Sequence, residues 1–477
     1  MLLKQIYDKK LSQYAYLIGC QATGEALLID PERDIDRYLR IAEEEGVRIT
    51  SVAETHIHAD FLSGCREFAE RIGVTVYLSA EGGEDWSYEW IDQDKQSGGT
   101  YDVELLEDRD TFSIGNIKLE ALHTPGHTPE HLSYLITDAG GGADRPMGLV
   151  SGDFIFVNDV GRPDLLESAA NVEGVMEPSA RTMYQSIQNF LEMPDHLQIW
   201  PGHGAGSACG KALGSVPHST AGYEKMFNPM IQAARNGEDT FVDEILKDQP
   251  EPQMYFARMK RDNKNGPSIL GTLPEPRPLS VPELTKEVQK QEAIVIDTRY
   301  DRSAFMKRHL PGSLYSPADK FFNTVIGSLV VDDMQPIVLL VDESDLEDCV
   351  RDLVRIGYDQ IYGYADLDTL NRYFERGGPR ESIEELTFDS AEPFYEEPGY
   401  DVLDVRLRSE FEEAHLPDAL NASYTRLPEY LDQLPQDKTF LVHCATGRRG
   451  AAASSYLQWK GVEVKFINDR LQRYLES

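Results

Sequence analysis

Cysteine is scarce in this chain: only five cysteines occur among 477 residues, at wide spacing. So few thiols form neither the disulfide framework of a small secreted protein nor a paired zinc knuckle. Long apolar segments are also lacking. Runs such as 337–341 have the length of a strand, and the N-terminus shows no apolar region of the signal-peptide type. We therefore expect a cytoplasmic protein.

Basic residues are few as well. The chain has 46 Lys and Arg against 82 Asp and Glu, which gives a net charge of −36 and a pI near 4.6. Such a surface repels phosphate backbones and anionic lipid headgroups, so we expect no nucleic-acid partner and no membrane partner. Hydrophobic residues make up 41% of the chain, which excludes wholesale disorder, and the length exceeds that of a single core.

Short apolar runs alternate with helical patterns over residues 1–245. The patterns predict helices at 34–45 and 62–72. Strands are predicted at 14–19, 26–30, 49–53, 74–78, 117–122, 132–136, 148–150 and 198–200. Two strand-rich halves with exterior helices indicate an α/β fold of the layered αββα type.

A connector and an internal repeat follow. Residues 246–278 contain the Pro-rich runs DQPEPQ and LPEPRP, which are typical of a linker. Residues 279–379 and 384–477 then share one plan: a strand, Asp-x-Arg, a helix, a His-Leu-Pro turn and a buried strand. Each copy has the size of a small α/β domain, so we expect three domains in all.

Histidine and aspartate residues follow several of the predicted strands. The sequence THIHAD at 55–60 places two imidazoles and a carboxylate at alternate positions, hence on one side of an extended chain. His123 and His127 lie in HTPGHTPEH, Asp153 in SGDFIF and His203 in WPGHGAG. A single one of these histidines is more often a hydrogen-bonded loop residue than a ligand. Together they indicate a metal site.

These motifs carry a family resemblance. Residues 1–245 resemble the metallo-β-lactamase superfamily, whose series THxHxD, GHT, GD and GHG is matched in order. Phe61 stands where the superfamily usually has a histidine ligand of a second metal. This variant is similar to the persulfide dioxygenases, relatives of glyoxalase II that hold one iron, so the resemblance implies one Fe(II) per chain, with zinc as the alternative. The implied metal ligands are His56, His127 and Asp153, and the implied residues that orient ligands or water are His58, Asp60 and His203.

Three further residues are candidates for substrate binding. In the persulfide dioxygenases a Gly-Arg-x-Asp segment lies near the active site, and the resemblance singles out Arg162 and Asp164; the alternative is that this pair only stabilises its own loop. Cys209 follows the last histidine motif among Gly and Ala residues, which leave its sulfur unshielded. We expect Cys209 to be a persulfide-handling thiol at the rim of the pocket.

The second repeat contains VHCATGRRGAAAS at 442–454, in which a cysteine ends a buried strand and a helix is predicted to start at Gly450. Backbone N–H groups and a helix N-terminus aimed at this sulfur would lower the thiol pKa and stabilise an anionic persulfide. Residues 384–477 resemble a rhodanese domain with a six-residue active loop. The resemblance implies that Cys444 accepts sulfur, that Arg449 is the loop arginine, and that Gly447 and Arg448 contact the substrate.

The first repeat keeps the Asp-x-Arg and His-Leu-Pro marks but not the cysteine. Asp342 stands where the catalytic cysteine belongs, and Cys349 follows seven residues later in a helical pattern. This repeat resembles a degenerate rhodanese domain, for which we expect a structural or docking role.

The combined resemblance implies a persulfide dioxygenase fused to tandem rhodanese domains. We expect it to oxidise a small-molecule persulfide with O2 to sulfite and thiol, and to convert sulfite to thiosulfate by sulfur transfer. We expect a homo-oligomer, dimer or tetramer. Two alternatives stay open: a thioester hydrolase of the glyoxalase II type with a sulfurtransferase tail, and a non-enzymatic persulfide carrier or sensor with a structural metal.

Overall fold

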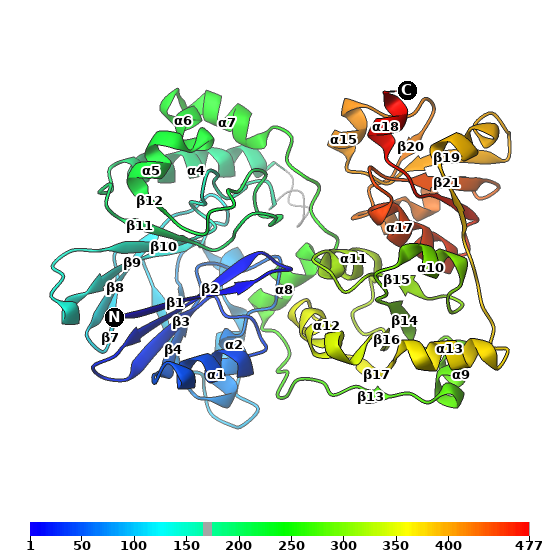
Figure 1. The fold of residues 1–477 in the computed structure, drawn as a ribbon. Coiled ribbons are helices and arrows are strands. Elements are labelled where there is room, and N and C mark those ends of the chain that lie inside the picture. Colours follow the sequence, from blue (N-terminus) through cyan, green and yellow to red (C-terminus); the bar gives the residue numbers. More distant parts are fainter. Residues whose placement is uncertain (166–173, 477) are drawn as a thin grey trace. The chain divides into compact units, whose positions relative to one another are not determined.

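The computed structural model describes residues 1–165 and 174–476 (Figure 1). The chain forms two compact units. Unit 1 comprises Met1–Pro252 and Phe256–Gly271, and unit 2 comprises Gln253–Tyr255 and Thr272–Ser477. The two repeats found in the sequence lie together in unit 2.

Unit 1 contains two six-stranded sheets. The first has the strand order β1-β2-β3-β4-β5-β6 and the second the order β12-β11-β10-β9-β8-β7. The strands of the first sheet are β1 (Leu2–Asp8), β2 (Gln13–Cys20), β3 (Glu25–Ile29), β4 (Arg48–Ala53), β5 (Thr75–Ser79) and β6 (Val103–Leu106). Those of the second are β7 (Thr111–Ile114), β8 (Ile117–His123), β9 (Leu132–Asp138), β10 (Gly148–Gly152), β11 (Gln198–Pro201) and β12 (Ser219–Thr220).

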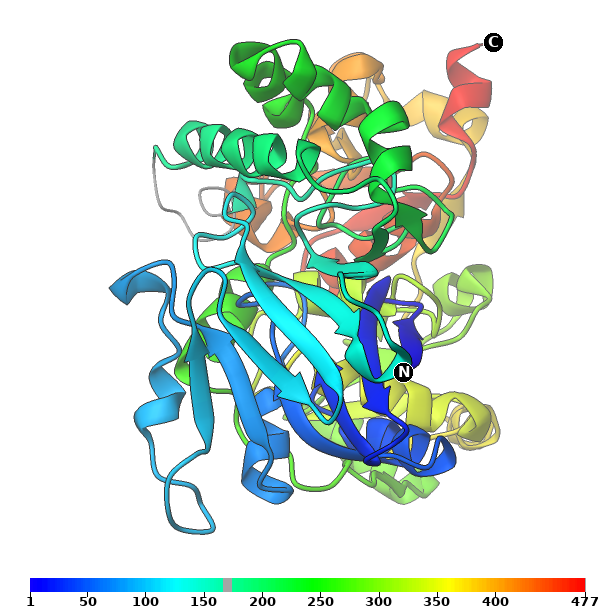
Figure 2. The same cartoon turned by 90° about the vertical axis from the view of Figure 1, so that its left-hand side faces the viewer.

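Helices cover the outer faces of both sheets. Helices α1 (Asp36–Glu44) and α2 (Cys65–Arg71) pack on the first sheet through Tyr38 and Phe68. On the second sheet lie α4 (Met176–Leu191), α5 (Ala221–Phe227), α6 (Pro229–Arg235) and α7 (Glu238–Leu246). In Figures 1 and 2 the blue helices α1 and α2 lie on one side of the strands of unit 1, and the green helices α4 to α7 lie on the other.

The inner faces of the two sheets share a core that includes Tyr16, Leu27, Tyr134 and Trp200. The predicted αββα architecture is therefore confirmed.

The sheets bring the predicted motifs to one edge. THIHAD follows β4, Asp153 follows β10, and His203 lies two residues after β11. Gly152 makes the turn before Asp153 with a φ of +50°, and a Cβ there would lie 2.7 Å from Nε2 of His131. Only glycine adopts this turn without strain.

Unit 2 contains two parallel five-stranded sheets with the same topology, β13-β17-β16-β14-β15 and β18-β22-β21-β19-β20. The strands are β13 (Arg277–Pro278), β14 (Ile294–Asp297), β15 (Leu314–Tyr315), β16 (Ile337–Leu340) and β17 (Ile361–Ala365), then β18 (Glu384–Leu386), β19 (Tyr400–Asp404), β20 (Leu420–Asn421), β21 (Thr439–His443) and β22 (Val464–Ile467). The identical strand order is the structural form of the sequence repeat.

Helices flank both of these sheets. Those of the first repeat are α9 (Val281–Lys290), α10 (Arg302–Lys307), α11 (Phe322–Leu329), α12 (Glu343–Arg355) and α13 (Leu367–Glu375). Those of the second are α14 (Phe388–Ala391), α15 (Arg408–Glu413), α16 (Leu427–Tyr430), α17 (Arg448–Trp459) and α18 (Leu471–Leu475).

The expected connector at 246–278 is only partly a connector. It contains helix α8 (Phe256–Asn265), which belongs to unit 1 and buries Phe256, Met259 and Asn263. Proline residues flank this helix on both sides, and they predicted a linker. The sequence pattern does not show which residues the helix packs against, so the helix was missed. Across the ranges that the structure describes, no helix is long and apolar enough to cross a bilayer.

Candidate functional site

Three side chains from separate loops converge in unit 1. His56, His127 and Asp153 each offer one ligand atom, and these atoms lie within 4.8 Å of one another. Oδ2 of Asp153 is 3.9 Å from Nε2 of His56 and 3.5 Å from Nε2 of His127. This oxygen is buried and has no hydrogen-bond partner among the described residues. A buried carboxylate oxygen without a partner is costly unless a cation or donor satisfies it, so these residues fit a metal ion.

Neighbouring groups orient both imidazoles. Nδ1 of His127 donates to the backbone carbonyl of Arg162 at 2.9 Å. Nδ1 of His56 lies 2.9 Å from the Thr55 hydroxyl, which itself donates to Asp30 and so is left to accept. Each Nε2 is thereby kept for the centre of the cluster. Burial lowers the pKa of both histidines, so the rings are neutral, as ligands must be.

Asp153 is held from its other side by His203. Nδ1 of His203 bonds Oδ1 of Asp153 and its Nε2 bonds Oδ2 of Asp60, both at 2.8 Å. Burial alone would lower the pKa of His203, but the two carboxylates raise it well above its ordinary value. In the protonated form His203 donates to both carboxylates and so holds Asp153 in place.

The ring of His58 lies beside that of His56, with the two ring centroids 4.2 Å apart. Its Nε2 is 3.2 Å from Oδ1 of Asp30. Burial alone would lower the pKa of His58, but the carboxylates of Asp30, Asp60 and Glu54 together raise it to about 9. The ring of Phe61, which is fully buried, packs 4.3 Å from that of His58. An apolar ring thus occupies the position that the superfamily resemblance gives to a further metal ligand.

Two residues that the sequence analysis missed support the ligand loops. Asn263 of α8 donates to the carbonyls of His58 and Phe61 at 2.8 and 2.7 Å and accepts from the amide of Ser63 at 2.8 Å. Nε2 of His131 accepts the backbone N–H of Asp153 at 3.0 Å, and burial lowers its pKa to about 3, which keeps it an acceptor. His131 could have been identified from the histidine-rich motif HTPGHTPEH, of which it is the last residue. No sequence feature near Asn263 indicates its contacts.

Arg162 and Asp164 pair with each other. The guanidinium of Arg162 donates to Asp164 at 2.8 and 2.5 Å and to the carbonyls of Ala208 and Pro250. Its side chain is 1% exposed. Of the two roles left open by the sequence, this geometry favours stabilisation of the loop whose carbonyl orients His127.

Cys209 is not at an exposed rim, and the expectation of an unshielded sulfur is wrong. Cys209 is 2% exposed. Its ligand atom lies within 4.8 Å of those of Asp60 and His203. Burial, followed by the charges of Asp60 and Asp153, raises the thiol pKa well above its ordinary value. The thiol therefore stays protonated beside the carboxylates.

The second candidate site lies in the second repeat of unit 2. Cys444 follows β21 directly and is buried, and the four residues 444–447 lead into α17. The helix starts at Arg448, two residues before the predicted start, because Gly447 takes the left-handed cap conformation with a φ of +85°. Both loop arginines consequently lie in the first turn, where the helix dipole is positive.

The two arginines have different partners. Arg449 forms a bidentate pair with Glu410, and its guanidinium lies 6.0 Å from the ring centroid of Tyr424. Arg448 pairs with Asp319 and lies over the ring of Phe321 at 4.3 Å. Asp319 and Phe321 belong to the first repeat, so side chains of both repeats hold the Cys444 loop.

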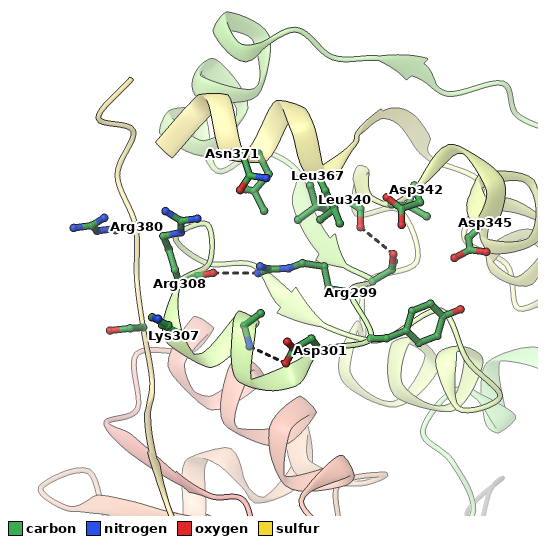
Figure 3. A pocket seen from close by; sticks show the side chains of 16 residues that line it. Arg299, Asp301, Lys307, Arg308, Leu340, Asp342, Asp345, Leu367, Asn371 and Arg380 are labelled. Carbon is green, nitrogen blue, oxygen red and sulfur yellow. Dashed lines mark hydrogen bonds between the residues drawn. The ribbon is translucent and has the colours of Figure 1, made fainter. Parts of the chain in front are cut away.

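The equivalent turn of the first repeat is too short to form such a loop. Only Val341 and Asp342 separate β16 from α12, and Cys349 is fully buried within that helix. A cavity of about 880 Å³ opens at these strand ends (Figure 3). Its lining includes Asp342, Asp345 and Arg308 and contains no cysteine among the described residues.

Unit 1 defines the chain as a layered α/β protein with a buried His/His/Asp cluster at its strand ends. Residues 8–203 match the Metallo-beta-lactamase superfamily and residues 388–476 match the Rhodanese-like domain. The chain belongs to the metallo-β-lactamase superfamily and carries a rhodanese-like domain after the metallo-β-lactamase domain, in the order expected from the sequence.

Several known proteins are similar. A metallo-beta-lactamase structure from Staphylococcus aureus subsp. aureus COL is 42% identical, with a TM-score of 0.66, over 77% of this chain and 99% of that one. The beta-lactamase hydrolase-like protein of Xylella fastidiosa (strain 9a5c) is 27% identical over 57% of this chain and 61% of that protein. The persulfide dioxygenase ETHE1 of Bos taurus, a mitochondrial protein, is 25% identical over 54% of this chain and 86% of that protein. The alignment thus spans only about six tenths of the Xylella relative.

Proposed function

We propose that this chain oxidises a low-molecular-weight thiol persulfide at a mononuclear iron centre. The balanced reaction is RSSH + O2 + H2O → RSH + SO3²⁻ + 2 H⁺. The observation that carries the proposal is the cluster of two imidazoles and one carboxylate around the partnerless Oδ2 of Asp153. Two histidines and one carboxylate are the ligand set of non-haem iron oxygenases, and they leave further coordination positions open.

A single metal is supported by Phe61. Its buried ring takes the place of an imidazole, and His203 is held by hydrogen bonds to two carboxylates. Iron held by His56, His127 and Asp153 would supply redox chemistry with dioxygen, which zinc does not.

The other residues of the site have positioning roles in this proposal. Asp60 and His203 fix the carboxylate of Asp153, and Asn263 fixes the loop that follows His56. The buried thiol of Cys209 lies beside this group, where it would contact the sulfur atoms of a bound persulfide.

A basic cleft next to these loops would receive the thiol carrier. The cleft has a volume of about 770 Å³ and is lined by Pro129, by the cations Lys260, Arg261 and Lys264, and by one carboxylate, Asp85, among others. Pro129 lies two residues after the ligand His127. Cationic side chains beside a metal loop favour a thiol that carries carboxylate or phosphate groups.

The second repeat would use the sulfite. In the proposed reaction Cys444 accepts a sulfane sulfur from a second persulfide and passes it to sulfite, which gives thiosulfate. The N-terminus of α17 and the adjacent arginines stabilise an anionic sulfur at this position.

A substrate panel tests the proposal against thioester hydrolysis. Protein reconstituted with Fe(II) under anoxic conditions is assayed for oxygen uptake with glutathione persulfide and coenzyme A persulfide, and for hydrolysis of the corresponding acyl thioesters. We expect oxygen uptake with at least one persulfide and no thioester hydrolysis. Thioester hydrolysis without oxygen uptake would identify the chain as a hydrolase. Absence of both activities would support the alternative of a persulfide carrier or sensor.

A further inference from the structure

The cavity of about 880 Å³ in the degenerate repeat has no part in the proposed sulfur chemistry, because its lining contains no cysteine among the described residues. The buried side chains of Leu340, Val341 and Leu370 belong to the lining and give the cavity an apolar floor. Charged side chains surround this floor (Figure 3). A concave site with an apolar base and a few placed polar groups is typical of a site for a small organic ligand.

Three cations of the lining gather on one side of the cavity. They are Lys307, Arg308 and Arg380, which lie together at the left of Figure 3. None of the three forms an ion pair within the ranges that the structure describes. Acidic residues outnumber basic ones by 82 to 46 in this chain, so three cations without a carboxylate leave a local region of positive charge.

The fourth cation of the lining, Arg299, is neutralised. Its Nε and Nη2 donate to the two carboxylate oxygens of Asp297 at 2.9 and 2.7 Å. Its Nη2 also donates to the backbone carbonyl of Arg308 at 3.1 Å, and the guanidinium of Arg308 lies 4.4 Å from the ring centroid of Phe374. Backbone and side chain of Arg308 are thus both held in place, so this cation is positioned to bind an anionic group.

Carboxylates define another part of the cavity. Asp342 and Asp345 lie at the right of Figure 3, and Asp301 accepts the backbone N–H of Ala304 at 3.0 Å. Among the described residues these three aspartates have no cationic partner. Asp342 and Asp345 stand at the start of α12, where the second repeat has Cys444 and the arginines of α17. Their charge offsets the positive end of the helix dipole, so this part of the cavity attracts a cation and repels an anion.

Helix α10 sets the distance between the two kinds of charge. Asp301 directly precedes this helix and Lys307 ends it, six residues further on. At about 1.5 Å per residue the two charges are about 9 Å apart along the helix. An extended peptide spans about 3.5 Å per residue, so the ammonium and carboxylate groups of a tripeptide are separated by a similar distance. The side-chain amide of Asn371, also in the lining, offers a donor and an acceptor to a peptide group.

We propose that the degenerate repeat binds a short zwitterionic peptide, of about three residues, in this cavity. The ammonium group of the peptide lies at Asp342 and Asp345, and its carboxylate lies at Arg308 and the two neighbouring cations. The peptide is bound without being changed, because the cavity offers it no cysteine. This inference does not depend on the proposed persulfide oxidation, and each can fail without the other.

Calorimetric titration of alanine peptides into the full chain tests the proposal. Trialanine should bind with a Kd of about 1 mM or below, and free alanine, which reaches only one kind of charge, should bind at least about tenfold more weakly. N-acetyl-trialanine lacks the ammonium group and trialanine amide lacks the carboxylate. Each should bind about tenfold more weakly than trialanine, since a charge-assisted hydrogen bond contributes about that factor.

Two substitutions assign the ends of the peptide. Asp345→Asn should weaken trialanine binding about tenfold and leave the binding of N-acetyl-trialanine unchanged, whereas Arg308→Gln should weaken trialanine and leave trialanine amide unchanged. The matched controls are Asp348→Asn and Arg376→Gln, at exposed positions outside the lining, and they should change none of these affinities.

Several results would overturn the inference. These are no binding of trialanine, equal affinities for the free and the blocked peptides, or a substitution that weakens all peptides alike. Thiosulfate bound as tightly as trialanine would identify a site for simple anions instead. The comparison of free with blocked peptides needs only the unchanged protein, so it decides the question even where a variant does not fold.

Discussion

Asn263 connects helix α8, which the sequence pattern predicted to be part of a linker, to the loop that follows the proposed metal ligand His56. It is 2% exposed, and its amide makes three hydrogen bonds to the backbone of residues 58–63. Replacing Asn263 with alanine leaves two carbonyls and one N–H of this buried loop without their partners.

The free-energy cost of Asn263→Ala follows from these three hydrogen bonds. Each buried backbone group that loses its partner costs about 1–3 kcal/mol, and partial relaxation of the loop keeps the sum near 3 kcal/mol. Such a change raises local amide exchange about 100-fold when exchange proceeds by opening of this loop. Because the loop follows directly after His56, metal affinity should fall about 10–100-fold.

Hydrogen–deuterium exchange of residues 54–64 and metal content after dialysis measure both effects. Asn265→Ala is the matched control, since Asn265 is exposed on the same helix. Exchange within threefold of the unchanged protein, or full metal retention in Asn263→Ala, would refute the reasoning that α8 stabilises the metal site.

Other substitutions separate the roles of the two sites. Alanine at any one of the three proposed ligands should abolish metal retention and oxygen uptake, whereas Asp60→Ala should reduce them only about 10–100-fold. Arg162→Ala should mainly speed the loss of metal and should raise KM for the persulfide less, because Arg162 bonds Asp164 and the carbonyl of Ala208 within the protein. A raised KM without faster metal loss would instead support a role in substrate binding. Cys444→Ser should stop sulfur transfer and leave oxygen uptake intact, so sulfite accumulates. Cys349→Ser, in a buried helix, should change neither activity, and a loss of transfer there would contradict the assignment of the degenerate repeat.

The sequence predicted the interior strands of unit 1 but none of the four edge strands. Strands β2 to β5 and β8 to β11 correspond to predicted strands. The strands β1, β6, β7 and β12 were not predicted. All four lie at the edge of a sheet. The strands β6 and β12 also have few buried residues, so their apolar periodicity is weak. Pairing with a distant neighbour, which no local pattern encodes, makes them strands.

The same limit applies to the candidate sites. The motifs that contain His56, His127 and Asp153 could be recognised in the sequence because each lies near a strand end, where side chains from different strands meet. The burial of Cys209 and the contacts of Asn263 depend on segments far away in the chain, so flanking Gly, Ala or Pro residues misled the prediction. The start of α17 was missed because the motif does not show that Gly447 takes the left-handed cap conformation, with Asn468 packed closely against it.

The most direct test of the central claim is the metal content of the purified chain, measured on the same sample whose oxygen uptake with persulfide is recorded. The account predicts about one iron per chain and an oxygen uptake that rises in proportion to iron occupancy and vanishes in zinc-loaded protein. Two zinc ions per chain, or oxygen uptake unrelated to iron content, would contradict it.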